Sequence, residues 1–217
     1  MCGRFTLAKP GEAVAAHFRL ETAPVLSARY NIAPTQAVLA VRARSGGGRE
    51  ASGFRWGLIP SWARGAANPT APLINARAEG LARKPAFREA WRQRRCLIPA
   101  DGFYEWQPVE GKKQRCCWHI RRRDGELFAF AGLWEPWPPA VALPPGAASG
   151  QSCALITTRP NPLVAPVHDR MPVVLPPEVY AKWLDPAAEA AALEPLLQPW
   201  QADAWERVRV ETPLPPA

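Results

Sequence analysis

The chain of 217 residues lacks the features that mark membrane and secreted proteins. It has no apolar run of about 18 residues or more, the length that a membrane-spanning helix needs. Its first residues, MCGRFTLAKPGEAVAAHF, carry scattered charges and only a short Ala/Val stretch, unlike a secretory signal. We therefore expect a cytoplasmic protein that does not cross a membrane.

Cysteine is also sparse and irregularly spaced. The five cysteines are Cys2, Cys96, Cys116, Cys117 and Cys153. An odd number at such spacing does not match a disulfide framework, and no CxxC pair is present. The run CCWH (Cys116 to His119) contains metal-binding side chains, but structural zinc needs about four ligands and the other half of a site is missing. We expect no metal and no cofactor.

Acidic residues are outnumbered, with 19 Asp and Glu against 27 Lys and Arg, which gives a net charge of +8. A basic balance of this size favours a polyanionic partner such as nucleic acid. The arginine-rich runs at 92–95 and 121–123 are equally consistent with solvated protein faces. Charge alone therefore leaves nucleic-acid binding open.

Hydrophobic periodicity predicts short strands and helices, punctuated by 26 prolines and without internal repeats. Helices are expected at 10–18, after Pro85, at 176–185 and at 187–198. Strands are expected at 37–43, 51–58, 95–106 (with a turn at Asp101-Gly102) and 152–158.

The remaining segments complete the expected architecture. Residues 114–134 are expected to form a β-hairpin through Asp124-Gly125. Residues 135–151 are expected to form a mobile Pro/Ala/Gly loop, and 212–217 a Pro-rich tail. The whole pattern predicts a single α+β domain over 1–217, in which short helices flank an antiparallel or barrel-like β-sheet core.

Cys2 directly follows the initiator methionine. Its side chain is small enough to permit removal of Met1, which would leave Cys2 with a free α-amine beside its thiol. Such a 1,2-aminothiol condenses with an aldehyde to an imine, and the thiol then closes a five-membered thiazolidine. The alternative is a residue in an unstructured N-terminus, which position alone favours.

Several polar residues interrupt apolar or proline-framed stretches, where packing alone would not require them. Asn75 and Arg77 lie in PLINARAEG, Glu105 lies in PADGFYEW, and His168 lies in VHDRMPVVL. Each also has a structural interpretation. Glu105 could be a core carboxylate paired with an arginine, His168 a hydrogen-bonded strand cap, and Asn75 a turn former.

Together and in this order, six motifs resemble the SRAP (SOS response-associated peptidase) family over residues 2 to about 184. These motifs are MCGRF, RYNIAP, WGLIPSW, LINARAEG, RCLIPADGFYEW and HDRMPVVL. The resemblance implies a DNA-damage protein that links its N-terminal cysteine to abasic sites in single-stranded DNA through a thiazolidine. It would associate with the nucleoid when bound to DNA, and we expect a monomer.

The resemblance also implies roles for individual residues. Cys2, Asn75, Glu105 and His168 would be catalytic, with Glu105 as the acid/base group, Asn75 orienting the intermediate and His168 serving proton transfer and the reverse reaction. Arg4, Arg77 and Arg170 would hold phosphates, and Pro34, Trp106 and Thr157 would line the strand or stack on its bases. Gly3 and Asn31 complete the expected DNA-binding set. We also expect nearby cations such as Arg4 to favour the thiolate of Cys2.

Two other classes of function remain open. A peptidase or amidohydrolase with an N-terminal nucleophile would use the same cysteine thiol and α-amine. A protein that binds single-stranded DNA without chemistry would need only the basic balance and the tryptophans.

Overall fold

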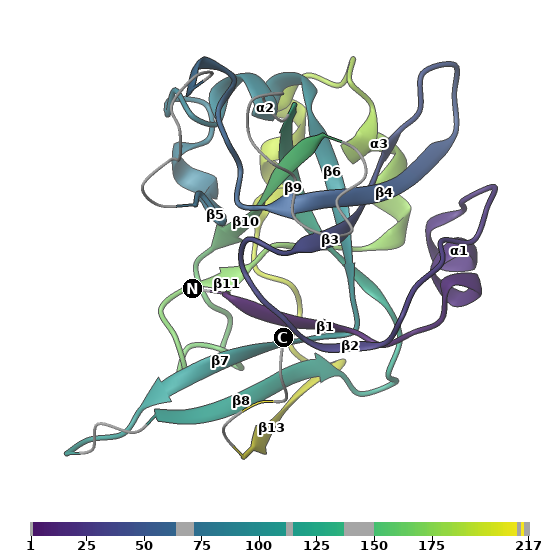
Figure 1. Ribbon diagram of the computed structural model, residues 1–217. Helices are drawn as coiled ribbons and strands as arrows, with labels where there is room; N and C mark the ends of the chain where they lie inside the picture. Colours follow the sequence, from purple (N-terminus) through teal and green to yellow (C-terminus); the bar gives the residue numbers. More distant parts are fainter. Residues whose placement is uncertain (1, 64–71, 112–114, 137–149, 212–213, 215–217) are drawn as a thin grey trace.

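The strands of the molecule form two β-sheets that pack face to face, with short helices at the outside (Figure 1). The computed structural model describes residues 2–63, 72–111, 115–136, 150–211 and 214. The first sheet has the order β13 (Trp205–Val210), β8 (Arg115–Arg122), β7 (Gly102–Pro108), β1 (Arg4–Leu7) and β2 (Arg29–Ile32).

The second sheet has eight strands and carries most of the core. Its order is β11 (Met171–Pro172), β10 (Gln151–Thr158), β4 (Arg49–Trp56), β3 (Ala37–Ala43), β6 (Arg95–Ala100), β9 (Phe128–Pro136) and β12 (Val174–Leu175), with β5 (Asn75–Arg77) beside β10. Most pairs are antiparallel, but β10 runs parallel to both β4 and β5. The expected α+β fold is thus confirmed, with a mixed second sheet.

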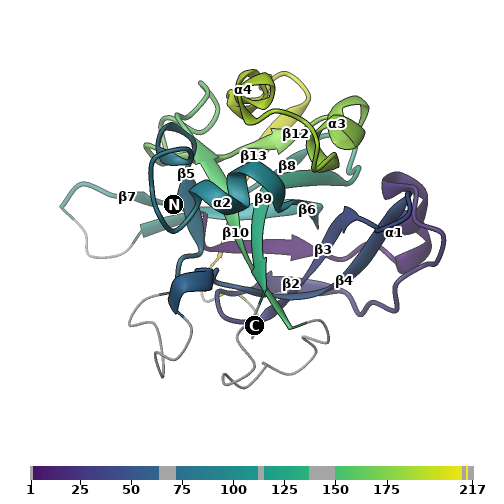
Figure 2. The ribbon, with the colours of Figure 1, turned by 90° about the horizontal axis from the view of Figure 1, so that it is seen from above.

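Short helical segments connect and cover the strands (Figure 2). The α-helices are α1 (Gly11–Phe18), α2 (Arg88–Gln93), α3 (Tyr180–Leu184) and α4 (Ala190–Leu193). The 3-10 helices are η1 (Ser61–Ala63), η2 (Ala78–Gly80), η3 (Pro177–Val179) and η4 (Glu194–Leu197). Within the described residues, no helix combines the length and apolar character needed to cross a membrane.

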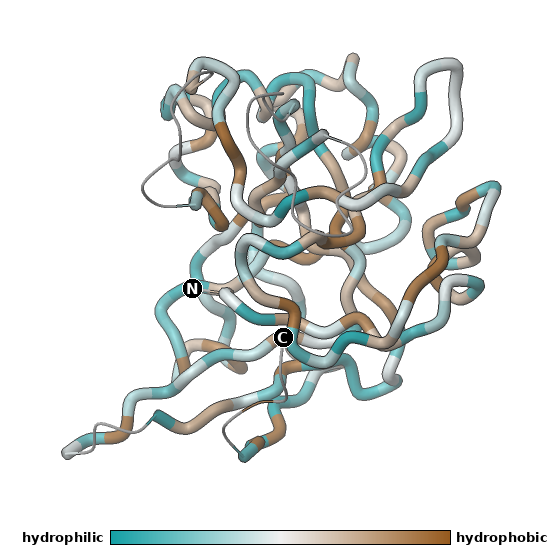
Figure 3. Tube along the Cα trace, in the orientation of Figure 1, coloured by the Kyte–Doolittle hydropathy of each residue, from teal (hydrophilic) through white to brown (hydrophobic). Residues whose placement is uncertain are grey.

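Aromatic side chains join the two sheets. Phe5 of β1 contacts Trp56 and Phe130 of the second sheet edge to face, with ring centroids 5.1 and 5.6 Å apart. On the other side of the second sheet, Trp183 of α3 donates an indole hydrogen bond to the carbonyl of Cys96 (2.9 Å). Hydrophobic and hydrophilic positions are interspersed along the strands of both sheets (Figure 3). Central strands such as β6 are buried along their whole length because both faces are covered.

The expected hairpin at 114–134 is wrong. β8 pairs with β7 and β13, whereas β9 pairs with β6, β10 and β12 of the other sheet. The turn at Asp124-Gly125 therefore carries the chain from one sheet to the other. The physical reason lies in burial: the first six residues of β9 are all buried, which requires cover on both faces, whereas β8 is partly exposed.

The expected loop at 135–151 is shorter at both ends. Glu135 and Pro136 continue β9, and Gln151 begins β10 directly opposite Pro136. Residues 137–149, and all of the tail at 212–217 except Leu214, lie outside the described residues.

Candidate active site

The N-terminal end of β1, the start of β5 and the middle of β7 converge on one corner of the molecule. β1 pairs with β7 so that Arg4 lies opposite Tyr104, and β5 pairs with β10. This pairing brings together Cys2, Asn75 and Glu105, which are far apart in the sequence.

Cys2 is fully buried and held by a side chain from β5. The side-chain amide of Asn75 donates a hydrogen bond to the carbonyl oxygen of Cys2 (3.0 Å), and the Cys2 thiol points back to the carbonyl of Arg4 (Sγ to O, 3.9 Å). The Asn75 Oδ1 atom is buried and has no hydrogen-bond partner among the described residues. A buried acceptor without a partner is costly, so this oxygen is available to a ligand.

Glu105 is a buried carboxylic acid, only 2% exposed. Burial raises its pKa to about 7, the reverse of the shift that an arginine partner would produce. Burial also raises the pKa of the Cys2 thiol well above its usual value, and the negative charge of Glu105 adds to that rise. The Glu105 carboxyl is therefore close enough to the Cys2 thiol to affect the ionisation of the thiol.

The expectation that Arg4 favours the Cys2 thiolate is wrong. The pKa of the thiol is raised rather than lowered, because burial and the charge of Glu105 both oppose ionisation. The Arg4 guanidinium donates to the carbonyl of Gly3 (3.0 Å). The thiol therefore stays protonated and needs a base when it reacts.

His168 lies in the segment that leads into β11. Its Nδ1 accepts a hydrogen bond from the backbone N–H of Arg170 (3.0 Å). A carboxylate oxygen of Asp169 lies 2.8 Å from the same Nδ1, a contact that becomes an ion pair when the ring is protonated. Partial burial lowers the pKa of His168.

His168 also lines a cavity of about 420 Å³. This cavity lies between the paired strands β7 and β8 and the loop at 165–169, which leads toward β11. The lining residues are Trp106, Pro108, Arg115, Ala165, Pro166, Val167, His168 and Asp169. Asp169 further raises the pKa of Glu105, which puts this loop within electrostatic range of the buried carboxyl.

The arginines expected to hold phosphates differ in their surroundings. Arg77 ends β5 and is exposed. Arg170 is largely buried, and its guanidinium donates to both carboxylate oxygens of Glu79 (Nη1 to Oε1, 2.7 Å; Nη2 to Oε2, 3.0 Å) and to the carbonyl of Thr157 (2.6 Å). Arg170 therefore already holds an anion.

The other expected DNA-binding residues differ in how exposed they are. Trp106 is partly exposed, with its ring 6.4 Å from that of Tyr104. Gly3, Asn31 and Pro34 are partly exposed as well. Thr157 is fully buried, and its hydroxyl has no hydrogen-bond partner among the described residues.

The sequence motifs contain two further residues to which no role was assigned, Trp62 in WGLIPSW and Glu79 in LINARAEG. Trp62 of η1 is 68% exposed, an unusual position for a large aromatic ring and one suited to stacking. Glu79 follows Arg77 in the motif LINARAEG, but only the structure reveals its contact with Arg170. In the described part of the chain, no three His, Cys, Asp or Glu side chains cluster as a metal site would require.

Comparison with known proteins agrees with this fold and shows the family to which the chain belongs. The family model for SOS response associated peptidase (SRAP) matches residues 1–214, and the chain belongs to this family. Abasic site processing protein YoqW of Bacillus subtilis (strain 168) is 38% identical over 98% of this chain and 93% of its own length. Abasic site processing protein YedK of Escherichia coli (strain K12) is 30% identical over 85% and 79%, respectively.

The fold itself has also been seen in a crystal structure. That structure, of a protein from Bacteroides thetaiotaomicron, covers 97% of this chain and 92% of its own, with a TM-score of 0.83 at 24% identity. At this identity the likeness supports the fold alone.

Proposed function

We propose that the protein processes abasic sites in single-stranded DNA by forming a covalent link to them through Cys2, after removal of Met1. The observation that carries this proposal is the convergence of Cys2, Asn75 and Glu105, with the Glu105 charge acting directly on the Cys2 thiol. The names of the relatives YoqW and YedK support the same substrate.

In the first step, the neutral α-amine of Cys2 attacks C1′ of the ring-opened abasic sugar. A free α-amine has a pKa of about 7.7–8.0, so a useful fraction is neutral near pH 7. The addition gives a carbinolamine, and loss of its hydroxyl as water gives an imine. Glu105, with a pKa of about 7, is partly protonated at neutral pH and can donate the proton that this water needs.

In the second step, the Cys2 sulfur adds to the imine carbon and closes the thiazolidine. The thiol must lose its proton, because burial and Glu105 hold its pKa high. The Glu105 carboxylate left by the first step can take this proton. The sulfur then adds to the carbon of the imine, which is still protonated on nitrogen, so the ring nitrogen keeps its one hydrogen and becomes neutral. Amine, aldehyde and thiol thus become a thiazolidine and one water, and the same carboxyl acts as acid and then base.

Asn75 and His168 would assist the reaction at Cys2 in different ways. Asn75 fixes the Cys2 backbone and offers its buried Oδ1 to the intermediate. His168 would move protons in the reverse reaction, ring opening of the thiazolidine. The imine stage also permits strand cleavage of the lyase type.

The DNA strand would be held by phosphate and base contacts around the same corner. Arg4, Arg77 and Arg170 would contact phosphates. Trp106 would stack on a base beside the cavity that it shares with His168. Gly3, Asn31, Pro34 and Thr157 complete the proposed DNA-binding set. We propose that the protein acts as a monomer.

One experiment separates this function from its two rivals. The protein is incubated with an abasic single strand and, separately, with the matched intact strand, and both are run on a denaturing gel. A heat-stable shifted band with the abasic strand alone supports the proposal. Binding that is lost on denaturation would indicate a non-covalent binder, and proteolysis of a test peptide without any DNA adduct would indicate an N-terminal-nucleophile peptidase.

A further inference from the structure

The guanidinium of Arg170 is bound end-on by a carboxylate. Nη1 and Nη2 each donate to one oxygen of Glu79, at 2.7 and 3.0 Å, and Nη2 also donates to the carbonyl of Thr157. The Nε atom is buried and has no hydrogen-bond partner among the described residues. Glu79 therefore occupies the Nη1 and Nη2 end of the guanidinium, which could otherwise donate two hydrogen bonds to a phosphate.

Glu79 also lies within the electrostatic range of a second arginine. The hydrogen bonds from Arg170 are the main cause of the lowered pKa of Glu79, and the charge of Arg77 lowers it further. Arg77 and Glu79 are close because η2 follows β5 directly, and Arg170 is close because β5 and β11 both pair with β10. One carboxylate thus stands between two of the three arginines proposed to hold phosphates.

Carboxylate and phosphate make the same paired contact with arginine, because both offer two oxygens to the planar guanidinium fork. They cannot occupy the same end of Arg170 together. We infer that Glu79 is a resident anion at the phosphate-binding surface, which holds Arg170 in the DNA-free protein and is replaced there by a DNA phosphate. This inference rests on the proposed binding of single-stranded DNA. It adds that the Glu79 carboxylate competes with the DNA for Arg170.

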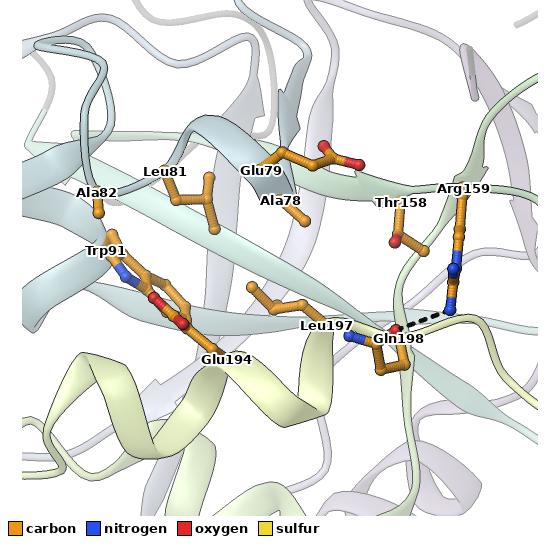
Figure 4. Close-up of a pocket in the computed structure, with 10 residues that line it drawn as sticks. All are labelled: Ala78, Glu79, Leu81, Ala82, Trp91, Thr158, Arg159, Glu194, Leu197 and Gln198. Atoms are coloured by element: carbon orange, nitrogen blue, oxygen red, sulfur yellow. Dashed lines mark hydrogen bonds between the residues drawn. The ribbon is translucent and has the colours of Figure 1, made fainter.

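The Glu79 side chain has space to move away from Arg170. Its side chain is 58% exposed, and it lies at the rim of a cavity of about 380 Å³ (Figure 4). In this view the Glu79 carboxylate extends toward the side of the cavity formed by Thr158 and Arg159. The one hydrogen bond found for the Arg159 side chain among the described residues is a long contact with Gln198 (3.5 Å). Arg159 therefore supplies a positive charge on the side of the cavity toward which the Glu79 carboxylate extends.

The inference predicts that removing the carboxylate tightens DNA binding. Affinity of Glu79→Gln for an intact single strand, without abasic sites, is measured by fluorescence anisotropy at several salt concentrations. We expect binding about two- to fivefold tighter, the range expected for freeing a partly exposed ion pair. The slope of log affinity against log salt should steepen by about 0.7, the value for one more phosphate contact on a single strand. Glu79→Ala should give the same result, and Glu178→Gln, an exposed carboxylate of η3, controls for net charge.

A double-mutant comparison ties the effect to Arg170. In an Arg170→Ala background, Glu79→Gln should tighten binding no more than Glu178→Gln does. Weaker binding by Glu79→Gln, or the same gain with and without Arg170, would overturn the inference. If the wild-type protein binds the strand and Glu79→Gln does not tighten it, the inference alone fails. If the wild-type protein does not bind single strands, the proposed function fails as well.

Discussion

The side-chain amide of Asn75 donates a hydrogen bond to the backbone carbonyl of Cys2 across 3.0 Å, although the two residues are 73 positions apart in the sequence. Asn75 is itself fixed opposite Leu155 by the parallel pairing of β5 with β10. The position of the N-terminal cysteine is therefore set by the second β-sheet, rather than by the N-terminal segment alone.

Asn75→Ala tests this anchoring. The substitution leaves the Cys2 carbonyl without its donor and should cost about 1–3 kcal/mol of unfolding free energy, the penalty for a buried group left unpaired. Because a shift of about 1 Å at a reacting centre can cost roughly 10²-fold in rate, cross-linking to an abasic single strand should slow by that order. Chemical denaturation and a cross-linking time course measure the two effects. An unchanged rate would mean that Asn75 does not position Cys2.

Glu105→Gln tests the raised pKa through stability. A carboxyl whose pKa is about 7 in the folded protein and about 4.5 when unfolded stabilises the fold in its protonated form. That contribution is fully present below about pH 4.5 and is lost as the pH rises through 7. The unfolding free energy of the wild type, relative to Glu105→Gln, should therefore fall by about 3 kcal/mol across this range. Denaturation of both proteins at several pH values gives this difference, and a flat difference would place the pKa near its usual value.

The same variant tests the chemistry. Glutamine keeps the shape of Glu105 but cannot move a proton, so cross-linking should slow by about 10²- to 10⁴-fold if Glu105 is the main acid/base group. A wild-type rate in Glu105→Gln would remove Glu105 from the mechanism.

Arg77→Ala tests the proposed phosphate contacts. A phosphate contact carries no base information, so binding should weaken alike for intact and abasic single strands. The slope of log affinity against log salt should become shallower by about 0.7. Arg209→Ala, which removes an exposed arginine of β13, is the charge-matched control and should keep the wild-type slope. Equal slopes for both variants would place Arg77 away from the DNA.

His168→Ala tests the division of labour between His168 and Glu105. If His168 serves ring opening, the variant should release its adduct to excess trap DNA more slowly, while forming it at nearly the wild-type rate. Time courses of formation and of release measure the two phases. An equal loss in both phases for His168→Ala and Glu105→Gln would mean that the two residues act as one unit.

Local patterns in the sequence predicted the elements, and the hairpin-like turn between 37–43 and 51–58 agrees with the antiparallel pairing of β3 and β4, but other pairings were not predicted. The strand expected at 37–43 matches β3 (Ala37–Ala43), because its apolar run is a local property. The separation of β8 and β9 into different sheets depends on long-range burial, which the turn at Asp124-Gly125 does not encode.

In the candidate site, too, the motifs identified the residues but not the interactions between them. Motifs pointed to Cys2, Asn75 and Glu105, and the fold brings these three together. The raised pKa of the Cys2 thiol could not be predicted from the sequence, because it arises from burial and from the charge of a distant residue. The pairing of Glu79 with Arg170 likewise depends on two strands that meet on β10.

The central claim is that the α-amine and thiol of Cys2 together trap an abasic site. Its most direct test is the intact mass of the protein after incubation with an abasic single-stranded oligonucleotide and heating. The account predicts a mass equal to the chain without Met1 plus the oligonucleotide minus one water, and no such heat-stable species with Cys2→Ala. That variant should still form an imine that borohydride can trap. A heat-stable adduct of the same yield in Cys2→Ala, or on a chain that retains Met1, would contradict the account.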